Sequence, residues 1–585
     1  MPDHKESLRP LGLRYRRTFV PFIVVLLGAA GCSSQSQNNI QRPAQTQTPA
    51  SSATIVKIQP QVQAAPAPVS QAFVARIREI GAAGQLDEME RSNFSDYKQH
   101  FNAIYEATGY APLWLQAGGL SPQGEGVIKA LEQCERKGLD PRDYDSAKWP
   151  QRVEGLKAAN DVQKADFDAA LTVEAMRYIS DLHIGRVNPK HFKFGIDAAI
   201  KKYDLPQFLN QQVIHAADIA AVLAEVEPAY NGYRRTEDAL VHYLELEKQG
   251  DGFPVPAVAK TVTMGDKYSG VPMLVARLRL LGDMLAGGVV EDYDSSVADA
   301  VKHFQVRHGL TPDGKLGATT VRELNVPIAS RVQQLGFALE RWRWMPPDFP
   351  HPPVVVNIPE FRLRAFEEGQ KIALSMNVVV GKAAPTQTPV FTDNIRFIVL
   401  RPYWNVPLSI VRSSVIPGIQ RSGTSYLTRQ RMEVSGGGGD LIAGLRSGRY
   451  TVRQKPGPKN SLGLIKFMFP NSYNVYLHST PATELFSQSR RDFSHGCIRV
   501  EKPAELAAFL LRNQDGGKWT ASAVQTAMDS GPDNRTVNLQ IPVPVLILYA
   551  TAVVEEDGAV HFFDDIYGHD RRLNDVLKKG TPYPW

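Results

Sequence analysis

The stretch "RDFSHGCIRV" spans residues 491–500 and places a cysteine, Cys497, directly after Gly496. His495 lies two positions before this thiol, and the chain of 585 residues has only three cysteines. Such a cysteine can be a buried filler, half of a disulfide, a metal ligand or a nucleophile. Because glycine has no Cβ, the backbone at Gly496 can approach a bound carbonyl group closely. The N–H groups of Gly496 and Cys497 could then stabilise an oxyanion, so the stretch favours a nucleophile.

A cysteine nucleophile needs a basic partner, because the thiolate attacks and a free thiol has a pKa near ~8.5. We therefore expect the sulfur of Cys497 to be held ionised within reach of an imidazole. His495 is adjacent in sequence. His478 lies in "NVYLHS", residues 474–479, where strand alternation places it on one face with Tyr476. The residues alone rank the two histidines equally, since catalytic pairs are formed in space.

The sequence around this stretch predicts a mainly β domain over residues 352–585, with a few helices. Runs such as "PPVVVNIPEFRLRAF" (352–366) alternate and are rich in β-branched residues. Residues 408–452 form a less regular insert that contains "SGGGGD". From 396 to 466, twelve basic residues far outnumber two acidic ones. This run is either a solvated face or a surface that attracts a substrate bearing carboxylates.

The region before this domain is mostly helical in pattern and predicts a scaffold over residues 73–270. "DFDAALTVEAMRYISDLHIGRVNP" (166–189) has apolar residues at helical spacing, with a helix end predicted at Gly185. Within this helix we expect Asp181 and His183 to be surface or capping groups. The predicted fold class is therefore a multidomain α+β protein, with a helical scaffold, a small helical module and a mainly β domain.

The setting of Cys134 differs from that of Cys497. Cys134 lies in "GVIKALEQCERKGL" (126–139), a helical pattern in which it shares the apolar face, so we expect a small buried residue. A chain with so few cysteines does not depend on a disulfide framework. His495 and Cys497, together with His478, could in principle hold zinc, but nothing else in the chain has the spacing of a second ligand cluster. We expect no metal and no cofactor.

The small module is predicted over residues 271–327. Its pattern "AVKHFQ…HGL…DGKLG…T…LN" gives a helix, a glycine-punctuated loop and a helix that starts near Ala318. This pattern resembles the three-helix peptidoglycan-binding domain, and whether it binds glycan or only packs stays open. A linker helix follows within residues 328–351. We expect its Trp342 and Trp344 to wedge against a neighbouring domain.

Residues 1–31 have the features of an export signal: basic residues precede an apolar run at 19–27 that is too short to span a bilayer comfortably. "LLGAAGC" resembles a bacterial lipobox, which implies lipidation of Cys32; an ordinary cleaved signal peptide is the alternative. Residues 32–72 are rich in Ser, Gln, Pro, Ala and Thr and predict a disordered tether. By resemblance to other lipoproteins, the lack of Asp after Cys32 favours the outer membrane, with the protein in the periplasm.

The motif around the thiol resembles the signature of the L,D-transpeptidase family. His478, a spacer, "SHGC" at 494–497 and then Arg499 match it in order and spacing. "RPYWNVP" and "RQKPGPKNSLGLIKFMFPN" are similar to the large subgroup, in which a scaffold and a peptidoglycan-binding module precede the catalytic domain. The resemblance covers nearly everything after the tether, and it implies that insert 408–452 is a mobile cap over the substrate.

The resemblance also implies roles for the site residues. Cys497 would be the nucleophile and His478 the general base, with the backbone carbonyl of Ser479 orienting the imidazole. His495 would support the pocket, and the amides of Gly496 and Cys497 would form the oxyanion hole.

Three further residues are candidate substrate contacts. In a strand, Arg499 points the same way as Cys497, so it could bind a substrate carboxylate or form a structural ion pair. Tyr403 and Trp404 could line the substrate groove, although aromatic residues of a β domain often belong to its core.

The family resemblance implies an enzyme that forms 3-3 cross-links in peptidoglycan through a cysteine thioacyl intermediate, with release of D-alanine. Its partners would be a tetrapeptide donor, a diamino-acid acceptor and wall-synthesis enzymes or carboxypeptidases that supply tetrapeptide. The net charge of +6 does not demand nucleic acid. Two alternatives stay open. One is a cysteine peptidase, with His561 or His569 as base, or an L,D-carboxypeptidase; the other is a non-catalytic wall-binding lipoprotein.

Overall fold

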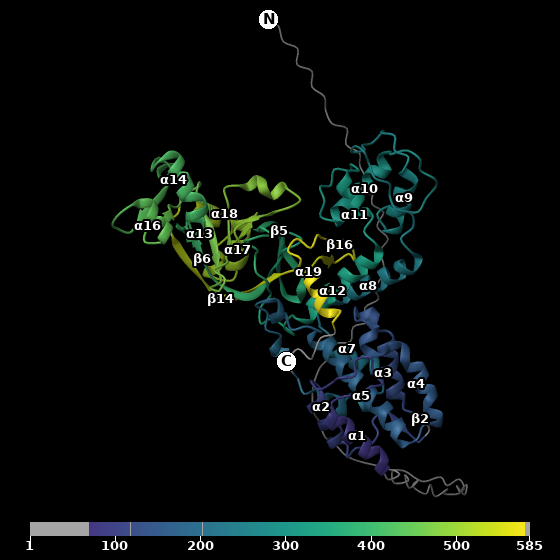
Figure 1. Ribbon diagram of the computed structural model, residues 1–585. Coiled ribbons are helices and arrows are strands. Elements are labelled where there is room, and N and C mark those ends of the chain that lie inside the picture. Colours follow the sequence, from purple (N-terminus) through teal and green to yellow (C-terminus); the bar gives the residue numbers. More distant parts are fainter. Residues whose placement is uncertain (1–68, 118, 202, 580–585) are drawn as a thin grey trace, which may run out of the picture. The chain divides into compact units, whose positions relative to one another are not determined.

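The computed structural model describes residues 69–117, 119–201 and 203–579 (Figure 1). The predicted export signal 1–31, Cys32 and most of the predicted tether lie outside the described residues, so they stay predictions. No helix among the described residues has both the length and the apolar composition needed to cross a membrane.

The N-terminal region is helical, as predicted, and is built around one long buried helix, α5 (Asp161–Ile184). Seventeen of the 24 residues of α5 are buried, on every side of the helix, because other helices surround it. Its start is fixed by Asn160, whose side chain caps Gln163 N–H, and it ends at Gly185 as predicted. The other elements are α1 (Gln71–Ala83), α2 (Lys98–Ala107), β1 (Leu115–Gln116), β2 (Gly119–Leu120), α3 (Pro122–Glu132), α4 (Trp149–Gly155), α6 (Leu205–Gln211), α7 (Ile219–Val226) and α8 (Asn231–Gln249).

The small helical module has its own apolar core and consists of α9 (Val271–Leu280), α10 (Ser295–Arg307) and α11 (Ala318–Leu324). The predicted linker helix is α12 (Ile328–Arg343). Trp342 near its end lies 5.5 Å, ring centre to ring centre, from Tyr230. Trp344 lies 6.1 Å from the ring of Phe194. The expectation that these tryptophans wedge against a neighbouring region is confirmed.

The C-terminal region is mainly β, which confirms the predicted fold class. Within residues 203–579, nine strands form one sheet in the order β12-β5-β13-β11-β10-β6-β14-β3-β4, and β4 also pairs with β5. The sheet therefore closes on itself like a barrel. Its strands are β3 (Val354–Asn357), β4 (Arg362–Phe366), β5 (Ile372–Gly381), β6 (Phe391–Leu400), β10 (Ile465–Met468), β11 (Leu477–His478), β12 (Asp492–Ser494), β13 (Ile498–Val500) and β14 (Arg535–Leu548).

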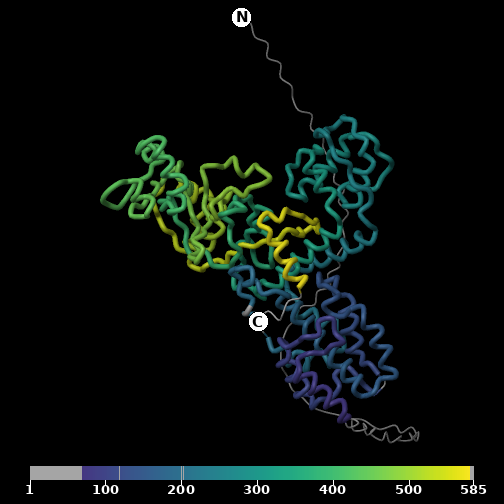
Figure 2. The backbone as a smooth tube through the Cα atoms, in the orientation of Figure 1, coloured from purple at the N-terminus to yellow at the C-terminus, as the bar shows by residue number. Residues whose placement is uncertain are grey.

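Two helices, α17 (Pro503–Leu511) and α18 (Ala521–Ser530), pack on this sheet and share its apolar core. A hairpin of β15 (Ala552–Val554) and β16 (Val560–Phe562) and then α19 (His569–Leu577) complete the described chain. Figure 2 shows this yellow C-terminal segment beside α12, in agreement with the contacts of α12 with β15 and α19.

The insert at 408–452 is more regular than the sequence predicts. It contains α13 (Leu408–Ile410), α14 (Ile416–Ser422), α15 (Ser425–Arg429) and α16 (Leu441–Ser447), and β8 (Met432–Ser435) pairs with β9 (Thr451–Gln454), which pairs with β7 (Trp404–Asn405). Its helices share an apolar cluster separate from that of the main sheet, and α13, α14 and α16 lie together in Figure 1. Helices of three to seven residues are too short to leave a periodic signal.

Candidate active site

The two candidate catalytic residues lie on neighbouring parallel strands. In β11 and β13, Leu477 pairs with Ile498 and His478 pairs with Arg499. Both apolar members of this ladder are fully buried in the core of the sheet. Since side chains alternate along a strand, His478 points to the opposite face, and Cys497 and Arg499 point to that same face. The register thus brings thiol and imidazole to one surface of the sheet.

The imidazole of His478 is held in a defined orientation. Its Nδ1 lies 2.5 Å from the carbonyl oxygen of Ser479, which accepts a hydrogen bond from the Nδ1–H tautomer. Nε2 is then the nitrogen that can accept a proton. Burial lowers the pKa of His478 to about 4, and the positive charge of Arg499 acts in the same direction, while the carbonyls of Ser479 and Leu462 oppose it. The ring is therefore neutral at pH 7 and able to act as a base.

Ser479 is itself fixed by the backbone beside it. Its Oγ accepts hydrogen bonds from the N–H groups of Leu464, at 2.7 Å, and Ile465, at 3.2 Å. Gly463 allows this approach: its φ is 64°, and a Cβ there would lie 2.1 Å from Ser479 Oγ. Only glycine fits this position without displacing the serine whose carbonyl orients His478.

The thiol of Cys497 does not meet the expectation that it is held ionised. Burial raises its pKa above the ordinary value, although Tyr476, Arg499 and Lys466 each act to lower it. Its Sγ lies 3.8 Å from the carbonyl oxygen of Asn474. The resting pair is thus a neutral thiol and a neutral imidazole, so proton transfer has to accompany attack.

The sequence alone assigned no role to two residues that lie around the thiol, Lys466 and Tyr476. Lys466 on β10 pairs with His478 and shares its face, and its Nζ lies 5.8 Å from the ring centre of Tyr476. Tyr476 is opposite Cys497 in the β11–β13 register, since its carbonyl accepts Ile498 N–H. Burial lowers the pKa of Lys466, and the negative thiolate of Cys497 raises it. Strand alternation alone indicated that Tyr476 shares the His478 face.

The backbone of the motif offers one free amide rather than two. Gly496 has a φ of 112°, and its N–H donates to Ser494 Oγ at 3.1 Å. Ser494 Oγ in turn donates to the carbonyl of Cys497 at 2.6 Å. Gly496 N–H is therefore occupied and not available as the expected oxyanion donor. Cys497 N–H donates to no acceptor in the part of the chain that the structure describes.

A neighbouring loop supports the motif from behind. Thr388 Oγ1 donates to the carbonyl of Gly496 at 2.8 Å, and Thr386 Oγ1 donates to that of Ser494 at 3.2 Å. His495 is exposed, and partial burial together with Lys382 and Arg499 lowers its pKa. Sequence reasoning missed both threonines, since their contacts depend on the loop that follows β5.

The candidate substrate contacts are distributed over two surfaces. Arg499 shares the face of Cys497, and its buried Nε has no hydrogen-bond partner among the described residues. Tyr403 and Trp404 instead belong to the base of the insert. The guanidinium of Arg453 lies 4.3 Å from the ring centre of Tyr403, and Trp404 packs on the insert's apolar cluster. Neither aromatic residue lies on β11 or β13, the strands that present His478 and the thiol.

The cysteine-peptidase alternative would use a histidine that follows Cys497 in the chain, His561 or His569. Both lie elsewhere in the fold. His561 is on β16, opposite Val553. His569 begins α19 and packs between aromatic rings, 4.6 Å from that of Tyr549 and 5.0 Å from that of Phe194. Neither belongs to the strand pair that presents the thiol.

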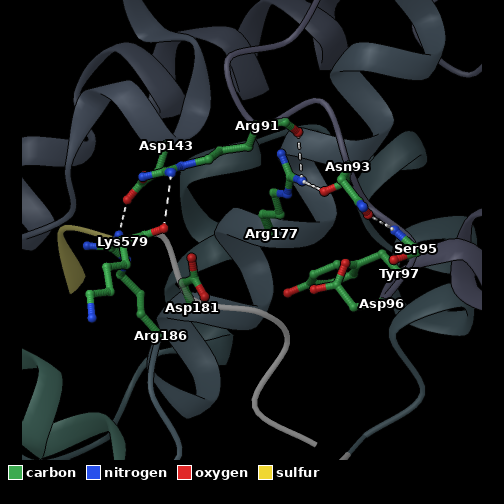
Figure 3. A pocket seen from close by; sticks show the side chains of 10 residues that line it. All are labelled: Arg91, Asn93, Ser95, Asp96, Tyr97, Asp143, Arg177, Asp181, Arg186 and Lys579. Carbon is green, nitrogen blue, oxygen red and sulfur yellow. Dashed lines mark hydrogen bonds and ion pairs between the residues drawn. The ribbon is translucent and has the colours of Figure 1, made fainter. Parts of the chain in front are cut away.

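Scaffold residues and Lys579 line a separate polar pocket of about 370 Å³, in which Arg91 and Arg186 both contact Asp143 (Figure 3). Asp181 lines this pocket and accepts a hydrogen bond from Tyr144 Oη at 2.6 Å. Burial raises the pKa of Asp181 to about 7.

The expectation that Asp181 and His183 are surface or capping groups is therefore wrong. The ring nitrogens of His183 both lie 2.8 Å from backbone carbonyls, those of Val226 and Lys201. Because other helices surround α5, both residues are half-buried and are bonded to groups of the surrounding scaffold. No set of three or more His, Cys, Asp or Glu side chains among the described residues is arranged to hold a metal ion.

Comparison with known proteins assigns these regions to families. Residues 352–537 match the L,D-transpeptidase catalytic domain, residues 99–240 the family described as "Scaffold domain", and residues 267–324 the family described as "Putative peptidoglycan binding domain". The chain thus carries a catalytic domain of the L,D-transpeptidase family, preceded by a scaffold domain and a peptidoglycan-binding domain.

One curated relative agrees with this assignment. The chain is 31% identical over 274 residues to a Haemophilus influenzae protein named "Putative L,D-transpeptidase". The match covers 44% of this chain and 53% of that relative, so the chain spans about half the length of the curated relative.

Two solved structures are also similar. The L,D-transpeptidase from Xylanimonas cellulosilytica is 16% identical with a TM-score of 0.16, and the match covers 50% of this chain and 100% of that one. A fused Zn-dependent amidase/peptidase/peptidoglycan-binding domain protein from Clostridium acetobutylicum is 13% identical with a TM-score of 0.14, covering 49% and 99%.

Proposed function

We propose that this protein is an L,D-transpeptidase that forms 3-3 cross-links in peptidoglycan, with Cys497 as nucleophile and His478 as general base. The observation that carries the proposal is the position of these two side chains on one face of adjacent parallel strands, with His478 Nδ1 bound to the Ser479 carbonyl. The match of residues 352–537 to the catalytic-domain family supports the same chemistry.

The first half-reaction would transfer an acyl group to sulfur. His478 Nε2 takes the thiol proton as Cys497 Sγ attacks the carbonyl carbon between the third and fourth residues of a tetrapeptide stem. The tetrahedral oxyanion collapses, the C–N bond breaks, and the imidazolium gives its proton to the leaving nitrogen. D-alanine departs with a free amine, and a thioester remains on the enzyme.

The second half-reaction would pass the acyl group to an amine. The side-chain amine of a diamino acid on another stem attacks the thioester carbonyl, and His478 accepts the proton that this amine loses. The C–S bond breaks, the sulfur recovers a proton from the imidazolium, and an amide joins the third residues of the two stems. Water in place of the amine would give the carboxypeptidase alternative from the same intermediate.

Charges beside the thiol would favour both steps. Lys466 and Arg499 are partly buried cations that act to lower the pKa of Cys497, so they stabilise the thiolate as it forms. Cys497 N–H is the available backbone donor for the oxyanion. We assign no oxyanion role to Gly496 N–H while it is bonded to Ser494.

The test is product analysis by mass spectrometry after incubation of the purified protein with a disaccharide-tetrapeptide. The proposal predicts cross-linked dimer and one D-alanine for each dimer formed. D-alanine with tripeptide and no dimer would favour the carboxypeptidase alternative. A wild-type protein that yields neither product would favour the non-catalytic alternative.

We further propose that Cys32 carries a lipid that holds the protein at the outer membrane, in the periplasm. The support is the lipobox-like "LLGAAGC" that ends at this residue. Cells labelled with an alkyne fatty acid should yield labelled protein, and Cys32→Ser should abolish both the label and recovery in the membrane fraction. Equal membrane recovery of the two proteins would contradict the anchor.

A further inference from the structure

The net charge of the chain is concentrated in one short stretch, residues 408–459. This stretch comprises the insert 408–452 and the residues that follow it up to 459, and from here on we call it the cap. The cap holds nine Lys and Arg residues and two acidic ones, for a net charge of +7. The whole chain has a net charge of +6, with 66 basic and 60 acidic residues. Outside the cap the charges are therefore almost balanced. A surface whose charges serve only solubility can carry both positive and negative side chains, as the rest of this chain does.

Most of the cap cations have no carboxylate to neutralise them. Glu433 accepts both Arg453 and Lys455, each at 2.9 Å. The remaining cations form no ion pair within the described residues, and all are exposed: Arg412, Arg421, Arg429, Arg431, Arg446, Arg449 and Lys459. These unpaired, exposed cations give the cap a positive field that attracts anionic partners.

The cap presents these cations on a defined framework. In its three-stranded sheet, Val434 pairs with Val452 on the side of the apolar cluster, whereas Glu433 pairs with Arg453 on the opposite side. The connections at the base are pinned by buried amides. Asn460 Nδ2 donates to the carbonyls of Pro402 and Lys455, at 3.0 Å each. The positive surface therefore belongs to a folded unit and not to a loose loop.

The cap joins the strands next to the candidate active site. It leaves the sheet after β6 and returns into β10, whose Lys466 shares the face of His478. An anionic polymer held by the cap would thus be held near Cys497. A lipid surface is a poorer match, because interfacial binding needs large apolar side chains beside the cations. Among the described residues of the cap, Leu408 is the only exposed large apolar one, at 37%.

We propose that the cap is a binding surface for the free carboxylates of peptidoglycan stem peptides. The stems that it binds belong to the same polymer but are not the stem that reacts at Cys497. The inference rests on the proposed function, since that function makes peptidoglycan the polymer that reaches Cys497. Several exposed guanidinium groups acting together give salt-sensitive attraction to a polymer that repeats its negative charge.

The test is co-sedimentation of the full-length protein with purified, insoluble peptidoglycan over a series of salt concentrations. The cap variant combines Arg421→Gln, Arg431→Gln and Arg446→Gln. The matched control combines Lys129→Gln, Arg136→Gln and Lys371→Gln, whose side chains are also exposed and form no ion pair among the described residues. Both variants lose three positive charges, so they separate the cap from net charge. Thermal melting checks that both are folded.

We expect the cap variant to bind roughly tenfold more weakly at low salt than the wild type or the control. Amidation of the polymer's carboxylates should weaken wild-type binding at least as much. Equal binding by the cap variant and the control would overturn the proposal, as would undiminished binding to amidated polymer. Phosphatidylglycerol vesicles serve as a competitor. If they abolish wild-type binding to peptidoglycan while amidation of the polymer has no effect, the surface binds lipid instead.

The outcome is separable from that of the proposed function. Cys497→Ala should sediment like the wild type, because the cap and not the thiol is the binding surface. Absence of acyl transfer by the wild type would contradict the proposed function, and the sedimentation result would be unchanged by it.

Discussion

Cys134 and Cys497 are the same side chain in two regions of this molecule, and their surroundings differ in exposure, neighbouring charge and access to a base. Cys134 is fully buried among the scaffold helices, 3.8 Å from the carbonyl of Leu139, and burial raises its pKa to about 12. Cys497 is partly exposed beside two cations and shares a face with His478.

The difference teaches that the neighbours, and not the residue type, make a nucleophile. Burial disfavours the thiolate at both positions. At Cys134 the main opposing group is the hydroxyl of Ser146, whereas at Cys497 a tyrosine and two cations oppose burial. The catalytic region thus carries the means to form the anion when it is needed.

The largest expected effect separates the two cysteines directly. Cys497→Ala should lower acyl transfer by at least about 10³-fold, because no other group can carry the acyl chain. Cys134→Ala should keep the wild-type rate and lose only some stability, since it removes a small buried side chain far from any substrate. Rates of D-alanine release measured side by side check both. A comparable loss of D-alanine release in both variants would contradict the assignment of Cys497, and not Cys134, as the nucleophile.

The next effect tests the base. His478→Gln should slow acylation about 10²- to 10⁴-fold. With the pKa of His478 at about 4, the wild-type acylation rate should be level between roughly pH 5 and pH 8. In the variant the rate should rise about tenfold per pH unit, because only preformed thiolate reacts.

The exposed His242, which lies in the scaffold, gives the control. His242→Gln should reproduce the wild-type rate and its level pH profile. A wild-type profile that already climbs with pH in this range would mean that His478 does not take the proton.

Several features of this comparison could be predicted from the sequence. Helical spacing predicted burial of Cys134, and strand alternation predicted that Tyr476 and His478 share a face. The neighbours of the thiol could not be predicted this way. The position of Lys466 depends on which strands pair in the closed sheet, and alternation within one strand carries no information about its partner. The bond from Gly496 N–H to Ser494 depends on loop dihedrals that no periodicity encodes.

Stability at low pH should also depend on the catalytic region. The pKa of His478 is lowered from about 6.5 to about 4 in the folded state. The unfolded chain therefore takes up a proton first, and the stabilisation present above pH 6.5 is lost as pH falls towards 4, by about 3 kcal/mol. Denaturant unfolding of the wild type and His478→Gln at pH 7 and pH 4 checks this. The variant should lose correspondingly less, and equal losses would contradict the assignment.

The smallest expected effect concerns the support of the base. Gly463→Ala should push Ser479 away, since the added methyl group would lie 2.1 Å from its Oγ. Misorientation of His478 should then slow acylation roughly 10- to 100-fold. Gly155→Ala is the matched control, because a Cβ there meets no atom within 4 Å. If both variants acylate at the same rate, Ser479 does not position the imidazole.

The most direct measurement is the intact mass of the wild-type protein after brief incubation with a stem tetrapeptide, followed by digestion to locate the adduct. A mass increase equal to the tetrapeptide less D-alanine, mapped to Cys497, is the predicted result. An unmodified protein, or an acyl group on any other side chain, would contradict the account.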